Sequence, residues 1–418
     1  MDVLFERCAG LDVHKAFLIV CLLLGGGPKP KKLIQRFDTT TPGLLDLRDW
    51  LLQHGCTIIA MESTGVYWKP VYAVLEEDLS IVVGNARHMR NVPGRKTDVK
   101  DAEWIGQLLR HGLIRSSFVP PKDLRQLRDL LRYRTKLTHG RTAERNRVLK
   151  LLEDANIKLG SVASDAFGAS GMAMLQALIE GQEPPANIAE LARGRLRKKI
   201  PELTRALTGR LEDHHRDILR LQLRRLADIE RDIAELDTKI DKRLEPYREE
   251  HRRLMRIPGV DWIIAAIIIA ELGVTMSVYP TAKHAAAWSG VAPANCQSAG
   301  KSLGNFTRRG NPYLRVALVQ AANTLHASKG TYLGDKFRRL KARRGYKRAA
   351  MAIAHKILVS AYNIIKLKAE YRELGNTYLD TIDKDRTVDR MVRRLTRLGY
   401  KTHLEPIPGP NTPQPAAA

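Results

Sequence analysis

The sequence is poor in cysteine. Its 418 residues include four cysteines, at positions 8, 21, 56 and 296. None of them lies in a CxxC pair or in a Cys/His spacing that suits zinc. A disulfide scaffold and a zinc finger are therefore not expected, and the pattern fits a reducing compartment.

Long apolar segments are also missing. The longest runs, 16–24 and 262–270, are each about half of the length that a membrane span needs. Asp2, Glu6 and Arg7 interrupt any apolar stretch at the N-terminus, so no signal peptide is expected. We therefore expect a cytoplasmic protein that does not associate with a membrane.

Acidic residues are the third shortage. Seventy Lys and Arg stand against 45 Asp and Glu, which gives a formal net charge of +25. The hydrophobic fraction of 44% is ordinary for a globular protein and excludes wholesale disorder, and the length suggests two or three domains. The excess charge predicts a polyanionic partner, above all nucleic acid. Charge alone does not say whether the protein acts on that partner.

Residues 1–120 predict an α/β domain. Three apolar, β-prone runs separated by turn residues predict antiparallel strands at 8–13, 16–24 and 32–37. Buried strands and helices then alternate, with strands at 57–61 and 81–83 and helices at 41–54, 66–77 and 98–111. Thr41 is the candidate cap of the first helix, and Pro42 is expected at its first helical position. This order is that of a ribonuclease-H-like fold.

Residues 121–247 predict long charged helices. One helix is expected at 122–155 and another at about 203–244, with a Gly/Ala/Ser-richer segment at 160–185 between them. In the second helix apolar residues recur every seven positions, which predicts a short coiled-coil seam (Leu219, Leu226, Ile233 and Ile240, with Ile229 and Leu236 offset by three). An antiparallel hairpin within one chain and an oligomerisation arm both explain this seam.

Residues 248–370 predict a third, mostly helical region. The segment 257–260 resembles the turn of a helix-hairpin-helix, whose backbone N–H groups bind a DNA phosphate, but a plain helix–helix turn fits equally well. Core helices are expected at 313–326 and 349–367, and the intervening 336–350 holds eight basic residues and no acid. The extension 371–418 ends in a proline-rich tail that is predicted to be disordered.

Four acidic residues stand where a carboxylate has no use in packing. Asp12 and Glu62 each follow an apolar strand, and Asp98 and Asp101 share one face of a starting helix. Taken singly, each is explained as a turn residue or as charge at a helix N-terminus, where Thr97 or Asp98 is the candidate cap. Taken together they suggest a site for Mg²⁺ or Mn²⁺, because carboxylate oxygens suit hard cations and like charges repel without one.

Ser298 is a different kind of candidate. It lies in a small loop, 295–301, that basic residues follow. On its own it is an ordinary loop serine, because a hydroxyl becomes a nucleophile only when a base takes its proton. His284 is fourteen residues upstream, so the base would come from elsewhere in the fold or from a metal-bound hydroxide.

Four segments carry a family resemblance. They are GLDVHK at 10–15, MESTGVYW at 61–68, KTDVKDA at 96–102, and 288–315, which runs from WSGVAP through QSAGK to RGNPYLR. These segments resemble the DEDD transposases of bacterial insertion sequences, of the 110/1111 type. The resemblance covers about 8–120 and 250–370, and the segments occur in the order that the family has.

The resemblance implies a RuvC-like domain whose four metal-binding acids are Asp12, Glu62, Asp98 and Asp101. It also implies a C-terminal transposase domain whose nucleophile is Ser298, in one composite site with Mg²⁺ or Mn²⁺. In such enzymes a covalent phosphoserine link conserves the bond energy while strands are exchanged. Family members pair as dimers into tetramers, and several are guided by a bridge-type RNA that pairs with donor and target DNA.

We therefore expect a bacterial DNA transposase or recombinase with four regions, 1–120, 121–247, 248–370 and 371–418. One alternative is a RuvC-like junction nuclease that uses metal-activated water and no covalent serine. Another is a nucleic-acid-binding scaffold with vestigial acids.

Overall fold

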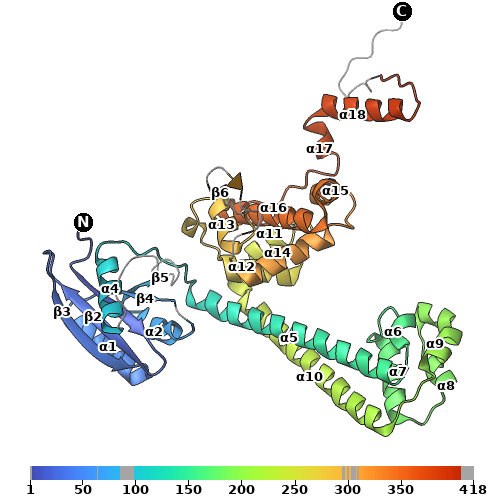
Figure 1. Cartoon of the computed structure of the whole chain (residues 1–418), viewed down its shortest axis with the longest axis horizontal. Coiled ribbons are helices and arrows are strands. Elements are labelled where there is room, and N and C mark those ends of the chain that lie inside the picture. Colours follow the sequence, from blue (N-terminus) through green and yellow to red (C-terminus); the bar gives the residue numbers. More distant parts are fainter. Residues whose placement is uncertain are drawn as a thin grey trace, which may run out of the picture. The chain divides into compact units, whose positions relative to one another are not determined.

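The computed structural model describes residues 2–63, 65–84, 98–293, 297, 298, 301, 302, 307 and 310–405, with the backbone alone for 98, 99, 297, 298, 301 and 302. The chain divides into two compact units, Met1–Pro120 and Pro121–Ala418 (Figure 1). The predicted cap Thr97, most of the loop around Ser298 and the end of the proline-rich tail lie outside the described residues. The divisions at 247 and 370 stay predictions.

The first unit is a mixed five-stranded sheet. The strand order is β3-β2-β1-β4-β5, with β1–β2 and β2–β3 antiparallel and β1–β4 and β4–β5 parallel. The elements are β1 (Arg7–Val13), β2 (Phe17–Leu24), β3 (Lys31–Asp38), α1 (Thr41–Gln53), β4 (Ile58–Glu62), α2 (Trp68–Leu75), β5 (Ser80–Gly84) and α4 (Asp98–Arg110). The mixed α/β sheet predicted from the sequence is confirmed.

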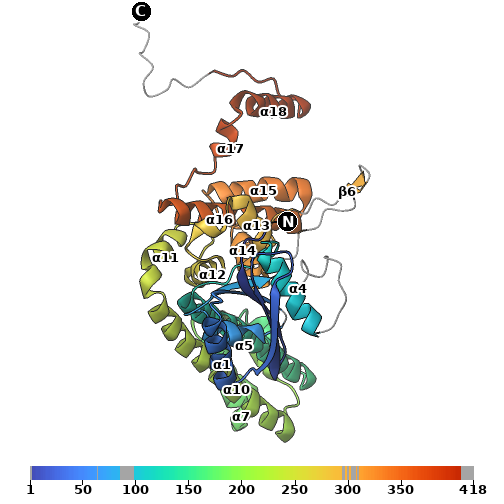
Figure 2. The ribbon, with the colours of Figure 1, turned by 90° about the vertical axis from the view of Figure 1, so that its left-hand side faces the viewer.

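Helices cover both faces of this sheet (Figure 2). Leu11 of β1 and Ile59 of β4 pack in one cluster with apolar residues of α1 and α2. Cys8 of β1 and Ala60 of β4 pack in a second cluster with residues of α4. Successive side chains of a strand point to opposite faces, so burial on both faces explains why these strands are nearly continuous apolar runs.

One small correction concerns the start of α1. The cap is Thr40, whose backbone is extended and whose side chain accepts a hydrogen bond from the Gly43 N–H at 3.4 Å. The predicted cap, Thr41, is the first residue of the helix, and Pro42, predicted at that position, is the second. An extended residue with a hydroxyl is what a cap requires, and Thr40 supplies both.

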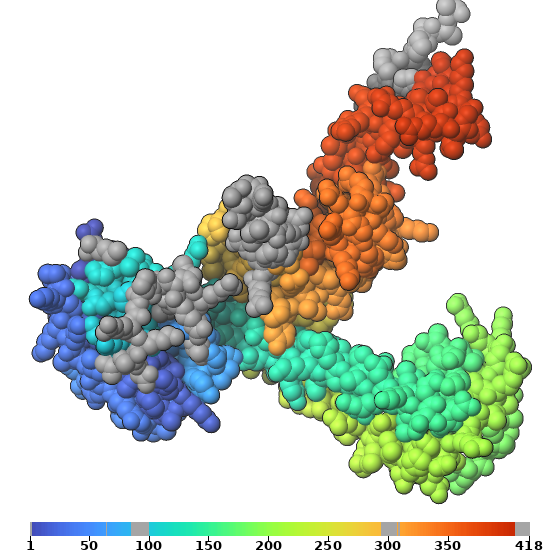
Figure 3. Space-filling model, in the orientation of Figure 1, coloured from blue at the N-terminus to red at the C-terminus, as the bar shows by residue number. Residues whose placement is uncertain are grey.

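The second unit begins with a helical hairpin. Helices α5 (Lys122–Asp154) and α10 (Asp213–Arg243) run antiparallel, and they lie against each other in Figure 3. The apolar seam residues of α10 are buried or half-buried, and α10 packs along α5 of the same chain. Arg134–Asp237 and Arg145–Glu230 ion pairs join the two helices. The seam thus packs within one chain, as the hairpin interpretation predicts. Oligomerisation through the same residues stays a prediction.

Short helices close the far end of the hairpin around a core of their own. They are α6 (Leu159–Val162), α7 (Ala169–Glu180), α8 (Pro185–Glu190), η1 (Gly194–Lys199) and α9 (Ile200–Leu207). The single helix predicted over 203–244 is therefore wrong, because α9 ends at Leu207 and α10 begins at Asp213. Gly209 explains the break, since a Cβ there would lie 2.5 Å from the Ala155 carbonyl oxygen.

The rest of the second unit is also helical. Its elements are η2 (Glu245–Tyr247), α11 (Arg248–Leu254), α12 (Trp262–Leu272), η3 (Met276–Val278), α13 (Ala282–Ser289), β6 (Gln297–Ser298), β7 (Lys301–Ser302), α14 (Pro312–Thr324), α15 (Tyr332–Arg344), α16 (Tyr346–Leu367), α17 (Tyr378–Thr381) and α18 (Lys384–Arg397). Among the described residues, α16 alone is long and apolar enough to cross a membrane, by length and composition only. Half of its most apolar window is buried, and it packs against α13, α14 and α15 as a core helix.

The turn at 257–260 joins α11 to α12. Gly259 has a positive φ of 85°, and a Cβ there would lie 2.5 Å from the carbonyl oxygen of Ala321 in α14. Asp261 then caps α12 by accepting the Ile264 N–H at 2.8 Å. The turn is therefore packed against α14, which favours a plain helix–helix turn over a phosphate-binding one.

Candidate active site

Asp12 and Glu62 lie at the carboxyl ends of neighbouring parallel strands. The pairing of β1 with β4 matches Gly10 with Ala60 and Leu11 with Met61, so Asp12 and Glu62 are the next pair. Neighbouring strands are about 4.8 Å apart. Because Cys8 and Ala60 face α4 and side chains alternate, both carboxylates lie on the α4 side of the sheet.

A pair of glycines lets α4 approach this face closely. A Cβ on Gly10 would lie 2.2 Å from both the Ala102 carbonyl oxygen and the Gly106 nitrogen. A Cβ on Gly106 would lie 3.2 Å from the Gly10 nitrogen. The backbones of β1 and α4 therefore touch at these two positions, where no side chain fits between them.

The direction of α4 carries its acidic first turn toward Asp12. Cys8 donates its thiol hydrogen to the Gly106 carbonyl oxygen at 3.7 Å, whereas Gly10, two residues further along β1, also meets Ala102. The helix α4 therefore runs antiparallel to β1. The turn that contains Asp98 and Asp101 is the one that lies beyond Gly10, on the side of Asp12. The fold brings Asp12, Glu62 and the backbone of this turn to one edge of the sheet.

His14, in the connection that follows β1, is a neighbour of Asp12. Its Nε2 atom lies 3.1 Å from Asp12 Oδ2, and the two side chains are 37% and 22% exposed. Its ring also packs against Phe17, with the centroids 4.8 Å apart. The contact holds one oxygen of Asp12 in place and leaves the carboxylate partly accessible to solvent. In the sequence, His14 belongs to the GLDVHK segment, and no role is predicted for it.

The described thiols of the first unit are packing groups. Burial raises the pKa of Cys8 to about 12 and the pKa values of Cys21 and Cys56 to about 11. All three are free and buried, so they remain protonated and unreactive at neutral pH.

Ser298 lies in a two-stranded hairpin of the second unit. Strand β6 pairs antiparallel with β7, with Ser298 opposite Lys301. An isolated bridge between Pro293 and Thr307 closes the hairpin further down. The side chain of Ser298 lies outside the described part of the structure, so its role as a nucleophile stays a prediction.

The chain that follows the serine hairpin is fixed, at Gly310 and Asn311, to the end of α13. Gly310 lies so close to that helix that a Cβ would be 2.3 Å from the Gly290 nitrogen and 2.5 Å from the Trp288 carbonyl oxygen. Asn311 donates its backbone N–H to the same Trp288 oxygen at 3.0 Å. The side chain of Asn311 then caps α14 by accepting the N–H groups of Tyr313 and Leu314.

Glu271 connects this capping residue to the helical hairpin. It is 2% exposed and accepts a hydrogen bond from Asn311 Nδ2 at 2.6 Å. Arg132 of α5 binds both of its carboxylate oxygens, at 2.7 and 2.8 Å, and Arg128 adds an ion pair at 3.1 Å. Burial lowers the pKa of Arg128, but a guanidinium stays charged in a protein. The base of the serine loop is therefore held by a buried, fully paired carboxylate.

Sequence reasoning missed this network. The segment from Arg309 to Arg315 stands out in the sequence only as a motif, and no spacing connects residue 271 with residues 128 and 132. One signal is present: Glu271 is the only charged residue of an otherwise apolar helix, Trp262–Leu272.

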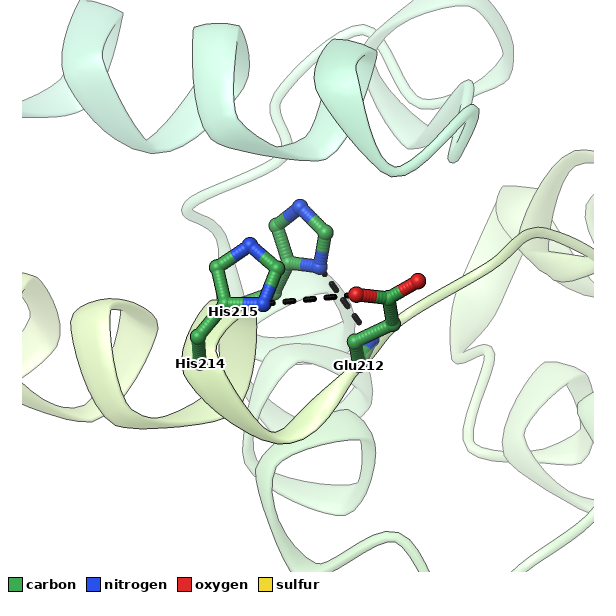
Figure 4. A group of neighbouring side chains, drawn as sticks. All are labelled: Glu212, His214 and His215. Carbon is green, nitrogen blue, oxygen red and sulfur yellow. Dashed lines mark hydrogen bonds and ion pairs between the residues drawn. The ribbon is translucent and has the colours of Figure 1, made fainter.

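A second group of metal-ligating side chains lies at the start of α10. Glu212, His214 and His215 place their ligand atoms within 4.8 Å of one another (Figure 4). His215 Nδ1 accepts the Glu212 backbone N–H at 3.1 Å, and its Nε2 lies 3.4 Å from Asp154 Oδ2. Both ring nitrogens are thus used in capping the helix and joining α5, which explains the cluster without a metal.

Comparisons with known proteins fit this arrangement. A family model described as a transposase, of the DEDD insertion-sequence 110 type, matches residues 9–157. A second model, described as the transposase IS116/IS110/IS902 family, matches residues 251–337. Together the two matches cover more than half of the chain, and they contain all five predicted site residues.

Two curated relatives carry the same kind of name. A probable family 20 transposase of Pseudomonas aeruginosa is 27% identical over 284 residues, which are 67% of this chain and 74% of that protein. The transposase for insertion sequence element IS1111A of Coxiella burnetii is 23% identical over 328 residues, 77% of this chain and 80% of that protein. The chain therefore belongs to the insertion-sequence 110/1111 family of DEDD transposases.

Proposed function

We propose that this transposase cuts and rejoins DNA through a covalent phosphoserine intermediate formed by Ser298. Asp12, Glu62, Asp98 and Asp101 would form the metal-binding half of the site. The observation that carries the proposal is the contact of Gly10 with α4, which directs the acidic first turn of the helix toward Asp12. We also propose that the protein acts in the bacterial cytoplasm, where the DNA is.

The sheet supports the assignment of a RuvC-like, ribonuclease-H-like fold to the first unit. Three antiparallel strands are followed by two parallel ones, and the central strand β1 has β2 on one side and β4 on the other. In this proposal the carboxyl ends of β1 and β4 and the start of α4 form the catalytic edge. Acids at strand ends are well placed for chemistry because they extend beyond the packed core.

The donor set fits a hard divalent cation, Mg²⁺ or Mn²⁺. Asp12 and Glu62 are adjacent across the sheet, and Asp101 is half-buried on the helix that covers this face. Oxygen donors alone suit these ions, and four carboxylates in one place need positive charge between them. When bound, the cation would neutralise and polarise a DNA phosphate.

The chemistry assigned to Ser298 is an exchange of one ester for another. Its Oγ would form a bond to phosphorus while one P–O bond of the DNA backbone breaks, and the freed sugar hydroxyl carries away a proton. No ester is lost, so a second sugar hydroxyl can reverse the step and join a new strand. The fixed base of the loop, at Gly310 and Asn311, would hold the hairpin steady against the phosphate.

We further propose that the chain works as a dimer that pairs into a tetramer and is guided by a bridge-type RNA. The net charge of +25 supports two nucleic acid partners. Guidance is tested by co-expressing the protein with its flanking sequence and sequencing the RNA that copurifies. Recovery of the protein without RNA would end the guided mechanism and leave the recombinase intact.

The covalent step has a direct test. Nicked or bulged DNA is incubated with Mg²⁺ and the wild-type protein, and a denaturation-resistant protein–DNA adduct is expected. Ser298→Ala should abolish this adduct, whereas Ser302→Ala, in the partner strand of the same hairpin, should retain it. A Ser298→Ala protein that still cuts would point to a metal-dependent junction nuclease instead. Full strand exchange by an Asp12→Ala protein would point to a scaffold with vestigial acids.

A further inference from the structure

An arginine-rich groove lies between α15 and the C-terminal helices α17 and α18. Figure 1 shows the course of the chain through these three helices. The groove has a volume of about 910 Å³, and seven of its eleven lining residues are arginines and two are aspartates. Figure 3 shows both α15 and α18 at the surface. The groove lies beyond residue 337, where the second family match ends, so neither family match covers it.

Two of the arginines connect the helices that form the groove, and a third is paired within α18. Arg339 of α15 binds Asp335 in its own helix at 2.7 Å and Asp380 of α17 at 2.6 Å. Arg390 of α18 lies 4.0 Å from the same Asp380, and Arg386 lies 3.9 Å from Asp383. The hydrogen bond from Arg339, together with the charge of Arg390, lowers the pKa of Asp380. Asp380 therefore stays ionised and keeps α17 attached to α15. These three residues have a structural use.

The other four arginines have no such use. Arg343 of α15 and Arg393, Arg394 and Arg397 of α18 are exposed, and within residues 310–405 no ion pair joins them to an acid. Charge at helix C-termini is favourable by only about 0.3–1 kcal/mol each. This accounts for an arginine at one helix end but not for the convergence of two helices on one groove. Like charges brought together repel, and an anionic ligand relieves that repulsion.

The spacing along α18 indicates a polymer instead of a single anion. Its five groove arginines run from Arg386 to Arg397, eleven residues apart on one face of the helix. At about 1.5 Å per residue this row is about 16 Å long. It would span about five phosphates of a strand, which are about 3.4 Å apart along the axis of a duplex. A guanidinium fork also matches the geometry of a phosphate.

We propose that this groove binds the phosphodiester backbone of a nucleic acid duplex, at a site separate from the catalytic residues. The four unpaired arginines make the phosphate contacts, and Arg339 and Arg390 keep the helices in place. Because it concerns binding alone, the inference does not depend on Ser298 or on the metal. The basic run at 336–350 contributes fewer free charges than its composition suggests. Arg338 donates to the Ser328 carbonyl oxygen, while Lys336 and Lys341 lie over tyrosine rings.

Binding is measured with the full-length chain and a short labelled DNA duplex of arbitrary sequence, in the presence of a chelator so that no strand is cut. The affinity is recorded over a range of salt concentrations, and the series is repeated with an RNA duplex of the same length. The groove variant carries Arg343→Gln, Arg393→Gln, Arg394→Gln and Arg397→Gln. The matched control removes four exposed arginines elsewhere, Arg195→Gln, Arg197→Gln, Arg220→Gln and Arg224→Gln.

The groove variant should bind at least about tenfold more weakly, with the slope of log affinity against log salt reduced by about 3 to 4. The control should retain both values. If the groove variant loses affinity equally for the DNA and the RNA duplex, the groove binds the phosphate backbone of both. If it loses affinity for one duplex alone, that nucleic acid is the one that the groove binds. No change in the groove variant, or an equal change in the control, would overturn it.

A lysine form of the groove variant separates charge from folding. Arg→Lys at the same four positions keeps the charge, so the salt slope should stay within about one of the wild-type value. A lysine form that loses the slope together with the helical signal would show that these arginines support the fold, and the proposal would fall. The covalent adduct of Ser298 is measured in a separate experiment. Either result of the binding experiment therefore leaves the proposed role of Ser298 untouched.

Discussion

The two units of the chain place carboxylates in opposite electrostatic settings. In the second unit Glu271 is 2% exposed and lies against Arg128, Arg132 and the side-chain amide of Asn311. In the first unit Asp12 has Glu62 as its neighbour across the sheet, and the acidic turn of α4 is directed toward the same edge. The first arrangement satisfies a negative charge, and the second accumulates several.

This difference separates structural from chemical roles. A carboxylate between two guanidinium groups has its charge balanced, and its removal leaves buried cations without a partner. Carboxylates gathered at one edge repel one another. Removing one of them reduces this repulsion, so the protein loses binding of the metal ion but not folding stability. Acid substitutions should therefore reduce stability in the second unit and activity in the first. The following predictions test that division.

The largest effect is expected from Asp12→Asn. The amide keeps the shape of the side chain but removes a charge from the proposed metal site, so adduct formation should fall at least about 10²–10³-fold. The free energy of unfolding should change little. Adduct yield against time and a urea unfolding curve measure the two quantities.

Asp46→Asn is the matched control for that substitution. Asp46 is an exposed residue of α1, on the opposite face of the sheet, and its substitution should leave adduct formation intact. Mg²⁺ should also raise the melting temperature of the wild-type protein but not of Asp12→Asn, because only a ligand of the folded state stabilises it. An Asp12→Asn protein that Mg²⁺ still stabilises would argue against these acids as the metal site.

Glu271→Gln should cost about 3 kcal/mol of stability in the second unit. The substitution leaves the part-buried Arg128 and Arg132 without a counter-charge, and breaking one partner of a buried pair costs about 3–5 kcal/mol. Glu230→Gln breaks the more exposed pair with Arg145 and should cost less than about 1 kcal/mol. Urea unfolding followed by a probe in the second unit compares them, and equal losses would contradict the division between the two kinds of acid.

Gly10→Ala should damage both stability and activity. The added Cβ would lie 2.2 Å from backbone atoms of α4, which cannot give way as a flexible side chain does. The helix must move, at a cost of about 1–3 kcal/mol, and its acids move with it. Gly27→Ala, where a Cβ meets nothing within 4 Å, is the control. An active, stable Gly10→Ala protein would show that close contact with α4 does not position the acids.

The sequence indicates the first unit far better than the second, for a physical reason. Strand periodicity and strand-end acids are local features, so Asp12 and Glu62 stand out from the sequence alone. The break between α9 and α10 depends on Gly209 meeting the carbonyl oxygen of Ala155, which no local pattern reveals. The Glu271 network and the arginine groove likewise join residues that are far apart in the chain. Their ion pairs are properties of the packed helices and not of any single helix.

The smallest effect concerns two histidines of the second unit, the buried His251 and the half-buried His355. Burial lowers the pKa values of His251 and His355 below the ordinary value of 6.5, so both are neutral in the folded protein at neutral pH. As the pH falls below that ordinary value, the unfolded chain takes up protons that the folded chain does not. Their contribution to stability is therefore complete above 6.5 and is lost as the pH falls toward the folded pKa values.

His251→Gln should reduce that acid sensitivity. The change in unfolding free energy between about pH 7.5 and pH 5.5 should shrink by about 1 kcal/mol, because one such histidine contributes at most about 1.4 kcal/mol per pH unit. If this variant keeps the wild-type dependence, burial of His251 against the Trp262 carbonyl is not what makes the second unit sensitive to acid. The sensitivity would then belong to His355, whose pKa burial also lowers.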